Sequence, residues 1–249
     1  MVFPQPAIEI LGIQVNEPVT TLTDLMVSAV CFYAFIKISN AKSTKKIKSY
    51  LRFYFLSMSI ATFIGGVIGH GFLYLFDSSW DLPEGLTSFV INIVGENNMN
   101  VTANPWKLPG WLTSMFSIAL VERAAIAYAS RIIKPAIGRF FAWMNIIELT
   151  TFVILTFSTL NFFFVEIHSF YGLMIVVASF SLFTFIKTRS KGSKLFLVAV
   201  GFSAISALFF MNQWSFHTWF NYLDISHTFM TIGAFIFYKG SMAILKECG

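Results

Sequence analysis

The hydropathy pattern of the chain consists of seven long apolar stretches separated by polar connections. A helix needs roughly 20 mainly apolar residues to cross about 30 Å of hydrocarbon, and each stretch is long enough to do so. The pattern therefore predicts an all-α integral membrane protein, a single seven-helix bundle over residues 1–249 with an outer loop at 77–107. The predicted spans lie at about 21–38, 50–76, 109–130, 139–164, 167–187, 194–213 and 221–244.

Basic residues are concentrated in every second connection and at the C-terminal end, and they predict the orientation. Short basic loops stay in the cytoplasm. This distribution requires an odd number of spans, so the N-terminus is expected outside and the C-terminus in the cytoplasm. The basic residues concerned are Lys42, Lys45, Lys46 and Lys48; Arg131, Lys134 and Arg139; Lys187, Arg189, Lys191 and Lys194; and Lys239 and Lys246, with Lys107 as the exception.

The composition excludes a soluble domain with a single membrane anchor. Only 12% of the 249 residues are charged, whereas 56% are hydrophobic and 30 are phenylalanine. The net charge of +5 comes from short loops with a topological role, so we expect membrane lipids as partners and no nucleic acid. The sequon Asn100-Val101-Thr102 falls on the outer side. The bias towards Phe, Ile, Lys and Asn favours a multi-pass protein of a bacterial cell membrane over a eukaryotic endomembrane.

Ionisable residues inside predicted spans fall into two layers, and the middle layer holds Glu122, Arg123 and Glu148. Such residues are costly in a bilayer and usually face the bundle interior or a cavity. Counting at 1.5 Å per residue brings Glu122 and Glu148 to similar depths. One interpretation is an Arg123–Glu148 ion pair that fixes helix packing. The other is a proton or ion relay with Glu122 as the unpaired carboxylate.

The outer layer contains all four histidines of the chain, His70, His168, His217 and His227. Asp224 and His227 are three residues apart, which places both on one helix face, and His70 has a similar depth. Two imidazoles and a carboxylate are three ligands of a catalytic zinc site that keeps one position for water. His70, Asp224 and His227 are therefore candidate zinc ligands, with His217 as a further one. The alternative is that these histidines only form hydrogen bonds at the membrane interface.

His70 and the stretch Tyr222-Leu-Asp-Ile-Ser-His227-Thr-Phe-Met-Thr-Ile-Gly233 resemble the CREST superfamily of seven-helix membrane hydrolases, which includes alkaline ceramidases and the progestin/adiponectin-receptor family. The resemblance implies zinc-dependent hydrolysis of a lipid amide. It also implies a catalytic aspartate, matched by Asp81 or else by Asp77. The chain departs from the pattern at Gly66, where the family has a serine, and at Leu223, where it has a histidine.

The sequence therefore favours a zinc-dependent intramembrane hydrolase that acts on a lipid amide or ester near the outer leaflet. An ion or small-molecule transporter or channel using Glu122, Arg123 and Glu148 is the first alternative. A non-catalytic, receptor-like seven-helix protein is the second. A retinal protein is not expected, because Lys239 lies near the cytoplasmic end of the last span.

Overall fold

The computed structural model describes residues 5–43, 45–76 and 104–248, and within them seven helical segments are long and apolar enough to cross a membrane. Asp77, Asp81 and the sequon at 100–102 lie outside the described residues. The spans consist of α1 (Pro18–Ser39); α2 (Lys46–Ile64) continued by the π-helix η1 (Gly65–Gly71); the 3-10 turn η4 (Pro105–Lys107) and α4 (Leu108–Ala129); α5 (Pro135–Thr159); α6 (Phe163–Phe170), the π-helix η5 (Tyr171–Val177) and α7 (Ala178–Thr188); α8 (Lys191–Asn212); and α9 (Tyr222–Cys248).

These segments confirm the predicted seven-helix bundle, and their length and apolar composition are those of a multi-pass membrane protein; no end differs from its predicted position by more than five residues. Most helices begin earlier than predicted. Pro18, Pro105 and Pro135 each open a helix, because proline suits the first turn and its missing N–H needs no partner there. The first turns of these helices are less apolar than the residues that follow. Hydropathy alone therefore predicts the start of each helix a few residues too late.

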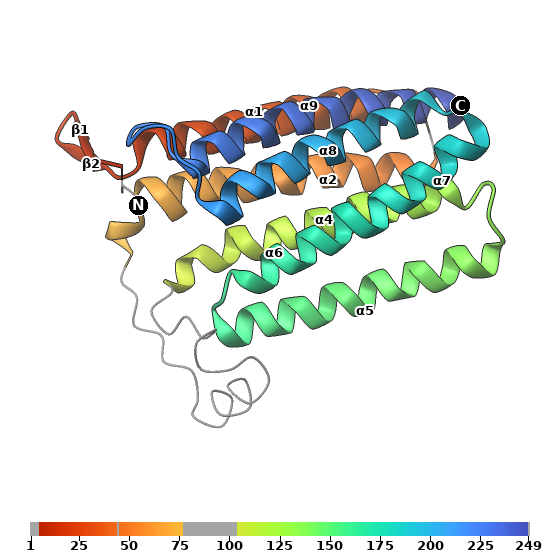
Figure 1. Cartoon of the computed structure of the whole chain (residues 1–249), viewed down its shortest axis with the longest axis horizontal. Helices are drawn as coiled ribbons and strands as arrows, with labels where there is room; N and C mark the ends of the chain where they lie inside the picture. Colours follow the sequence, from red (N-terminus) through yellow and green to blue (C-terminus); the bar gives the residue numbers. More distant parts are fainter. Residues whose placement is uncertain (1–4, 44, 77–103, 249) are drawn as a thin grey trace.

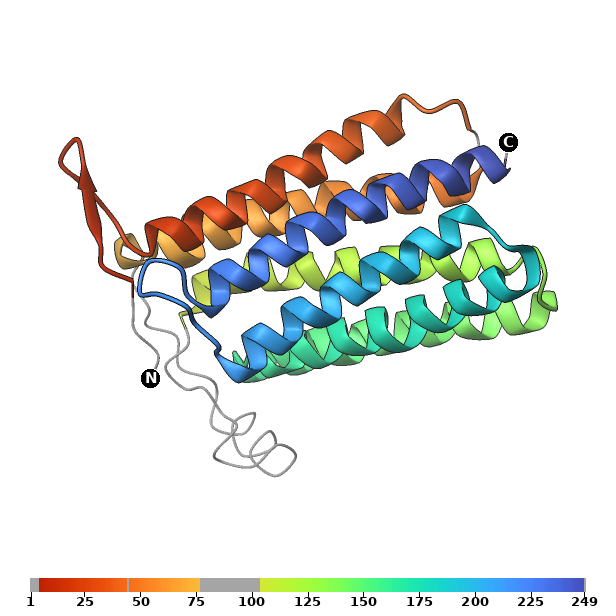
Figure 2. The ribbon, with the colours of Figure 1, turned by 45° about the horizontal axis from the view of Figure 1, so that its top comes forward.

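The helices run roughly parallel to one another along the bundle, with α1 and α9 at one edge and α5 at the opposite edge (Figures 1 and 2). The third span is central: 61% of its most apolar window is buried, compared with 11% for the fourth span. Helix α5 instead exposes large apolar side chains such as Trp143 and Ile147. Its outer face is therefore the surface that lipid would cover.

A short β-hairpin, which the hydropathy pattern did not predict, precedes α1. Strands β1 (Ile8–Ile10) and β2 (Ile13–Val15) pair antiparallel. Leu11 and Gly12 form the turn with φ angles of 53° and 79°, as a tight two-residue hairpin turn requires. The hairpin projects beyond one end of the bundle (Figure 1).

The opposite end of the bundle contains the C-terminus and the basic connections. Glu247, near the end of α9, accepts hydrogen bonds from the Ser190 hydroxyl at 2.7 Å and from the Gly192 N–H at 3.2 Å. These bonds join the last turn of α9 to the first turn of α8, where the N–H groups have no partner within the helix. The fold thus has two chemically different ends, and the histidines discussed next lie away from this basic end.

Candidate functional site

An outer cluster of five polar side chains joins α1, η1 and α9 at the hairpin end of the bundle. It consists of Glu17, Thr23, Asp24, His70 and His227. The relative exposure of the side chains is 7% for Asp24 and 12% for His227, but 21% for His70 and 35% for Glu17. The cluster is therefore closed on its α9 side and partly open where Glu17 and His70 lie.

The orientation of His70 is fixed by Glu17, the residue before α1. His70 Nδ1 is hydrogen-bonded to Glu17 Oε2. Burial alone raises the pKa of Glu17, but this bond and the positive charges of His70 and Lys107 bring the pKa below its ordinary value. Glu17 is thus a carboxylate and accepts the hydrogen bond, so Nδ1 carries the proton. Its backbone has a left-handed φ of 42°, which costs about 1–3 kcal/mol in a residue other than glycine.

The orientation of His227 is fixed in the same way by Thr23. His227 Nδ1 lies 3.2 Å from Thr23 Oγ1, and the Thr23 hydroxyl donates its single hydrogen to the carbonyl of Thr20 at 3.0 Å. Since a hydroxyl has only one hydrogen to give, Thr23 must accept from the ring. His227 Nδ1 therefore carries the proton as well.

Each imidazole consequently has its Nδ1 held by a hydrogen bond and directs its other nitrogen, Nε2, towards Asp24. The Asp24 oxygens lie 3.9 Å from His70 Nε2 and 3.5 Å from His227 Nε2, which is longer than an ordinary hydrogen bond. Two ligands of one tetrahedral zinc ion stand about 3.4 Å apart at bond lengths near 2.1 Å. A ring whose Nδ1 is held by a hydrogen bond and whose Nε2 faces a carboxylate has the arrangement typical of histidine metal ligands.

The sequence of η1 explains how Asp24 comes so close to the second span. Four of the seven residues in Gly65–Gly71 are glycine, and π-helical turns of this kind occur frequently at functional sites. A Cβ atom on Gly66 would lie 2.8 Å from Asp24 Cβ and 3.1 Å from the Thr21 carbonyl oxygen. Gly66 is therefore what allows α1 to place a carboxylate there.

Asp224, the carboxylate expected beside the histidines, has another role. It is fully buried and accepts hydrogen bonds from the Asn221 N–H at 2.7 Å, Gln5 Nε2 at 2.6 Å and Thr20 Oγ1 at 2.9 Å. These donors engage both of its oxygens, so Asp224 caps α9 and ties it to α1. Among the described residues it forms no ion pair with His70 or His227.

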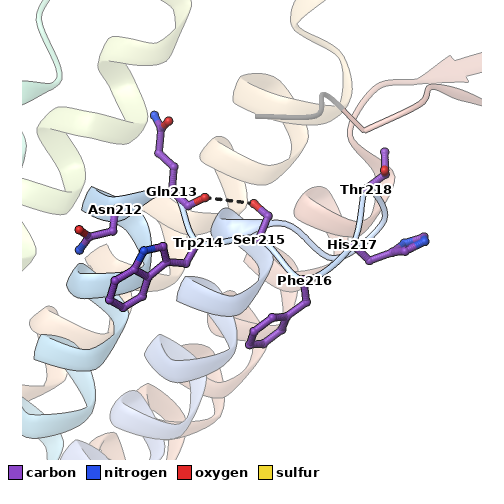
Figure 3. A pocket seen from close by; sticks show the side chains of 7 residues that line it. All are labelled: Asn212, Gln213, Trp214, Ser215, Phe216, His217 and Thr218. Atoms are coloured by element: carbon purple, nitrogen blue, oxygen red, sulfur yellow. Dashed lines mark hydrogen bonds between the residues drawn. The ribbon is translucent and has the colours of Figure 1, made fainter. Parts of the chain in front are cut away.

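His217 is not part of the outer cluster either. It lies on the exposed loop between α8 and α9, and its Nδ1 accepts a hydrogen bond from the Trp219 N–H at 3.1 Å. Its ring points outward from the loop, away from Trp214 (Figure 3). A hollow of about 550 Å³ in this loop is lined by residues 212–218 alone. None of these is acidic, so the hollow offers no carboxylate to complete a metal site.

A second cluster, the buried triad, lies deeper in the bundle and consists of Glu122 on α4, Glu148 on α5 and His168 on α6. One ligand atom of each residue lies within 4.8 Å of the others, and among the described residues this is the one group with that mutual spacing. His70, Asp24 and His227 do not meet this spacing with one ligand atom each, so the outer cluster would have to tighten before it could hold an ion.

The buried triad changes two expectations about the middle of the bundle. Glu148 pairs with His168 at 2.5 Å instead of with Arg123, and Arg123 forms no ion pair within the described ranges. His168 was assigned to the outer layer, but its side chain reaches the carboxylates. Counting residues along helix axes locates Cα atoms only, whereas long side chains converge from different depths.

Sequence reasoning missed Asp24 and Glu17. The signal for Asp24 was present, because an aspartate inside an apolar span is a functional candidate by itself. Glu17 precedes its span, and only the unusual backbone conformation brings its carboxylate to His70.

Comparison with known proteins identifies the family. The model of the Family of unknown function (DUF6962) matches residues 19–95 and 98–246, so the chain belongs to this family. No curated protein and no solved structure matches the chain.

The capping role of Asp224 predicts a stability defect. Replacing Asp224 by Ala leaves three donors without an acceptor, which should cost about 1–3 kcal/mol for the buried groups. We expect a lower midpoint of thermal unfolding in detergent, and no such change for the control His217→Ala, whose side chain is exposed. An unchanged midpoint in Asp224→Ala would contradict the assignment of Asp224 to helix capping.

Proposed function

We propose that this member of the DUF6962 family is a membrane-embedded, zinc-dependent hydrolase that cleaves a lipid amide or ester at the outer cluster. The observation that supports the proposal is the common direction of the two Nε2 atoms, which face one carboxylate from two helices. His70, His227 and Asp24 would hold the metal. Bound zinc supplies a water of lowered pKa and polarises a carbonyl group.

The side chains around the candidate ligands have separate tasks in this proposal. Glu17 and Thr23 keep the Nδ1 protons in place and so hold the rings in the ligand tautomer. Asp24 directs one oxygen to each histidine, so one of them can accept a proton from a water in the cluster. Because Glu17 and His70 are partly exposed, a lipid headgroup can approach from their side. Asp81 or Asp77 remains the proposed second carboxylate.

The hydrolase proposal predicts a matched loss of metal and activity. His70→Ala and His227→Ala should each lower the zinc content of the purified chain by about one ion. Each should also lower the hydrolysis of a fluorescent N-acyl lipid at least roughly 100-fold, since metal sites respond by such factors even to changes around the ligands. His217→Ala is the control, because it removes an exposed histidine from the same end of the chain. Full hydrolysis by His70→Ala would refute the proposal.

The orientation with the N-terminus outside and the C-terminus in the cytoplasm is part of the same proposal, since it places the outer cluster at the outer leaflet. The two native cysteines provide a test, because Cys31 is buried and Cys248 is partly exposed. A membrane-impermeant maleimide should label Cys248 only after cells are permeabilised. In a Cys248→Ser background, Leu11→Cys at the exposed hairpin turn should react in intact cells. Labelling of Cys248 in intact cells would reverse the orientation.

A transporter or channel that uses Glu122, Arg123 and Glu148 is the competing proposal. It is favoured by two buried carboxylate oxygens without a hydrogen-bond partner, Glu122 Oε1 and Glu148 Oε2, which suit an ion path. Proteoliposomes that contain the chain should then take up protons or divalent cations, and Glu122→Gln should abolish the flux. Lipid hydrolysis without any flux would instead favour the enzyme.

A further inference from the structure

The buried triad is chemically independent of the outer cluster, because it lies on α4, α5 and α6 and shares no residue with it. We propose that the triad is a second metal site, which binds one divalent first-row transition-metal ion through Glu122, Glu148 and His168. The hydrolase proposal assigns no role to these residues, and the site would exist whether or not the outer cluster is catalytic.

The triad is enclosed by the bundle. The side chains of Glu122 and His168 have no exposed surface, and that of Glu148 is 12% exposed. The three residues come from three helices, and one ligand atom from each meets the others within 4.8 Å. Three side chains from separate helices that converge in this way resemble the metal sites of helical bundles, in which carboxylates and histidines project inward from facing helices.

Hydrogen bonding fixes which ring nitrogen of His168 faces the carboxylates. His168 Nε2 lies 2.9 Å from the backbone oxygen of Met115, and since a carbonyl can only accept, Nε2 must carry a hydrogen. The other nitrogen, Nδ1, lies 2.5 Å from Glu148 Oε1. A histidine that donates one N–H to a backbone carbonyl and directs the other nitrogen to the site has the orientation of a metal ligand.

The carboxylates still lack partners after these bonds are counted. Glu122 Oε2 accepts a hydrogen bond from Asn145 Nδ2 at 3.1 Å, but Glu122 Oε1 and Glu148 Oε2 are buried without one. A buried charge is strongly disfavoured unless it is paired or coordinates a metal. One divalent cation balances two carboxylates and a neutral imidazole, so its binding would leave the site electrically neutral. Two oxygen ligands and one imidazole suit zinc, iron or manganese.

A glycine beside the triad leaves room for the Glu122 side chain. Gly172 lies in the π-helix η5, directly after α6, and a Cβ atom there would stand 2.5 Å from Glu122 Oε1 and 2.4 Å from Ile118 Cγ2. Any larger residue would press on both Glu122 and Ile118. Asn145, which holds the other Glu122 oxygen, also donates to the Ala119 carbonyl at 3.3 Å. The carboxylate is thus positioned from both sides.

The test is metal binding to the full chain in a background that removes the outer histidines, His70→Ala with His227→Ala. After treatment with a chelator, the purified protein is titrated with Zn²⁺ and, separately, with Mn²⁺. We expect one tightly bound ion per chain, and we expect Glu122→Gln or Glu148→Gln in this background to weaken binding roughly 100-fold. The substitutions keep the shape of the side chain and remove its charge.

A steric variant tests the site without removing a ligand. Gly172→Ala should weaken metal binding roughly tenfold, because its methyl group would stand only 2.5 Å from Glu122 Oε1 and push the carboxylate out of place. Gly201→Ala is the matched control, since a Cβ atom there would have no neighbour within 4 Å. If the carboxylate variants do not fold, the background chain itself decides: its midpoint of thermal unfolding should rise with zinc, as for any ligand that binds only the folded state.

Two results would overturn the proposal. One is a background chain that binds neither Zn²⁺ nor Mn²⁺ and gains no thermal stability from them, in which case the triad holds only protons. The other is binding that is unchanged in Glu122→Gln, Glu148→Gln and Gly172→Ala. Neither result bears on the hydrolase, whose histidines are already absent from this background.

Discussion

The structure depends on one constraint: an ionisable side chain buried in an apolar bundle has no water to bond and must find its partner on another helix. Asp24 meets this constraint by drawing η1 and α9 to α1, and Asp224 ties the start of α9 to α1 a second time. Glu148 binds His168, and Asn145 binds Glu122, so α5 is joined to α4 and α6 although most of its surface faces outward. These polar contacts therefore join α1 to η1 and α9, and α5 to α4 and α6.

Next to each cluster, a span widens locally from an α-helix to a π-helix. The π-helix η1 contains His70 and faces Asp24 with Gly66, while η5 follows His168 and faces Glu122 with Gly172. A π-helical turn shifts the side chains that follow it relative to a regular helix, and glycine removes the Cβ that would otherwise keep two helices apart. Because two separate spans combine a histidine, a π-helix and a glycine against a carboxylate, the widening is best explained by the side chains that it accommodates. Helix propensity alone would have favoured alanine at both positions.

The sequence was sufficient to predict the bundle but not the partners within it. Length and hydropathy identify a span, because a helix must be long and apolar to cross a bilayer, and this reasoning found all seven segments. It also recognised that His70 and His227 belong together at one end. Asp224 was predicted as the third ligand because it lies three residues before His227, and spacing along one helix is visible in sequence. That Gln5 and Thr20 would engage Asp224, and that Asp24 would face the two histidines instead, depends on contacts between segments far apart in the chain.

The two clusters follow the same hydrogen-bonding rule and differ in accessibility, and this difference separates what they can do. In each, a histidine gives one ring N–H to an oxygen acceptor and presents the other nitrogen to carboxylates. The outer cluster is partly exposed through Glu17 and His70, and its candidate ligand atoms do not yet have the mutual spacing of a metal site. Such an arrangement suits the proposed site, which would exchange water and substrate. The triad is closed and already has ligand spacing. A closed site with two carboxylate oxygens that have no hydrogen-bond partner suits the proposed ion, which would stay bound and hold α4, α5 and α6 together.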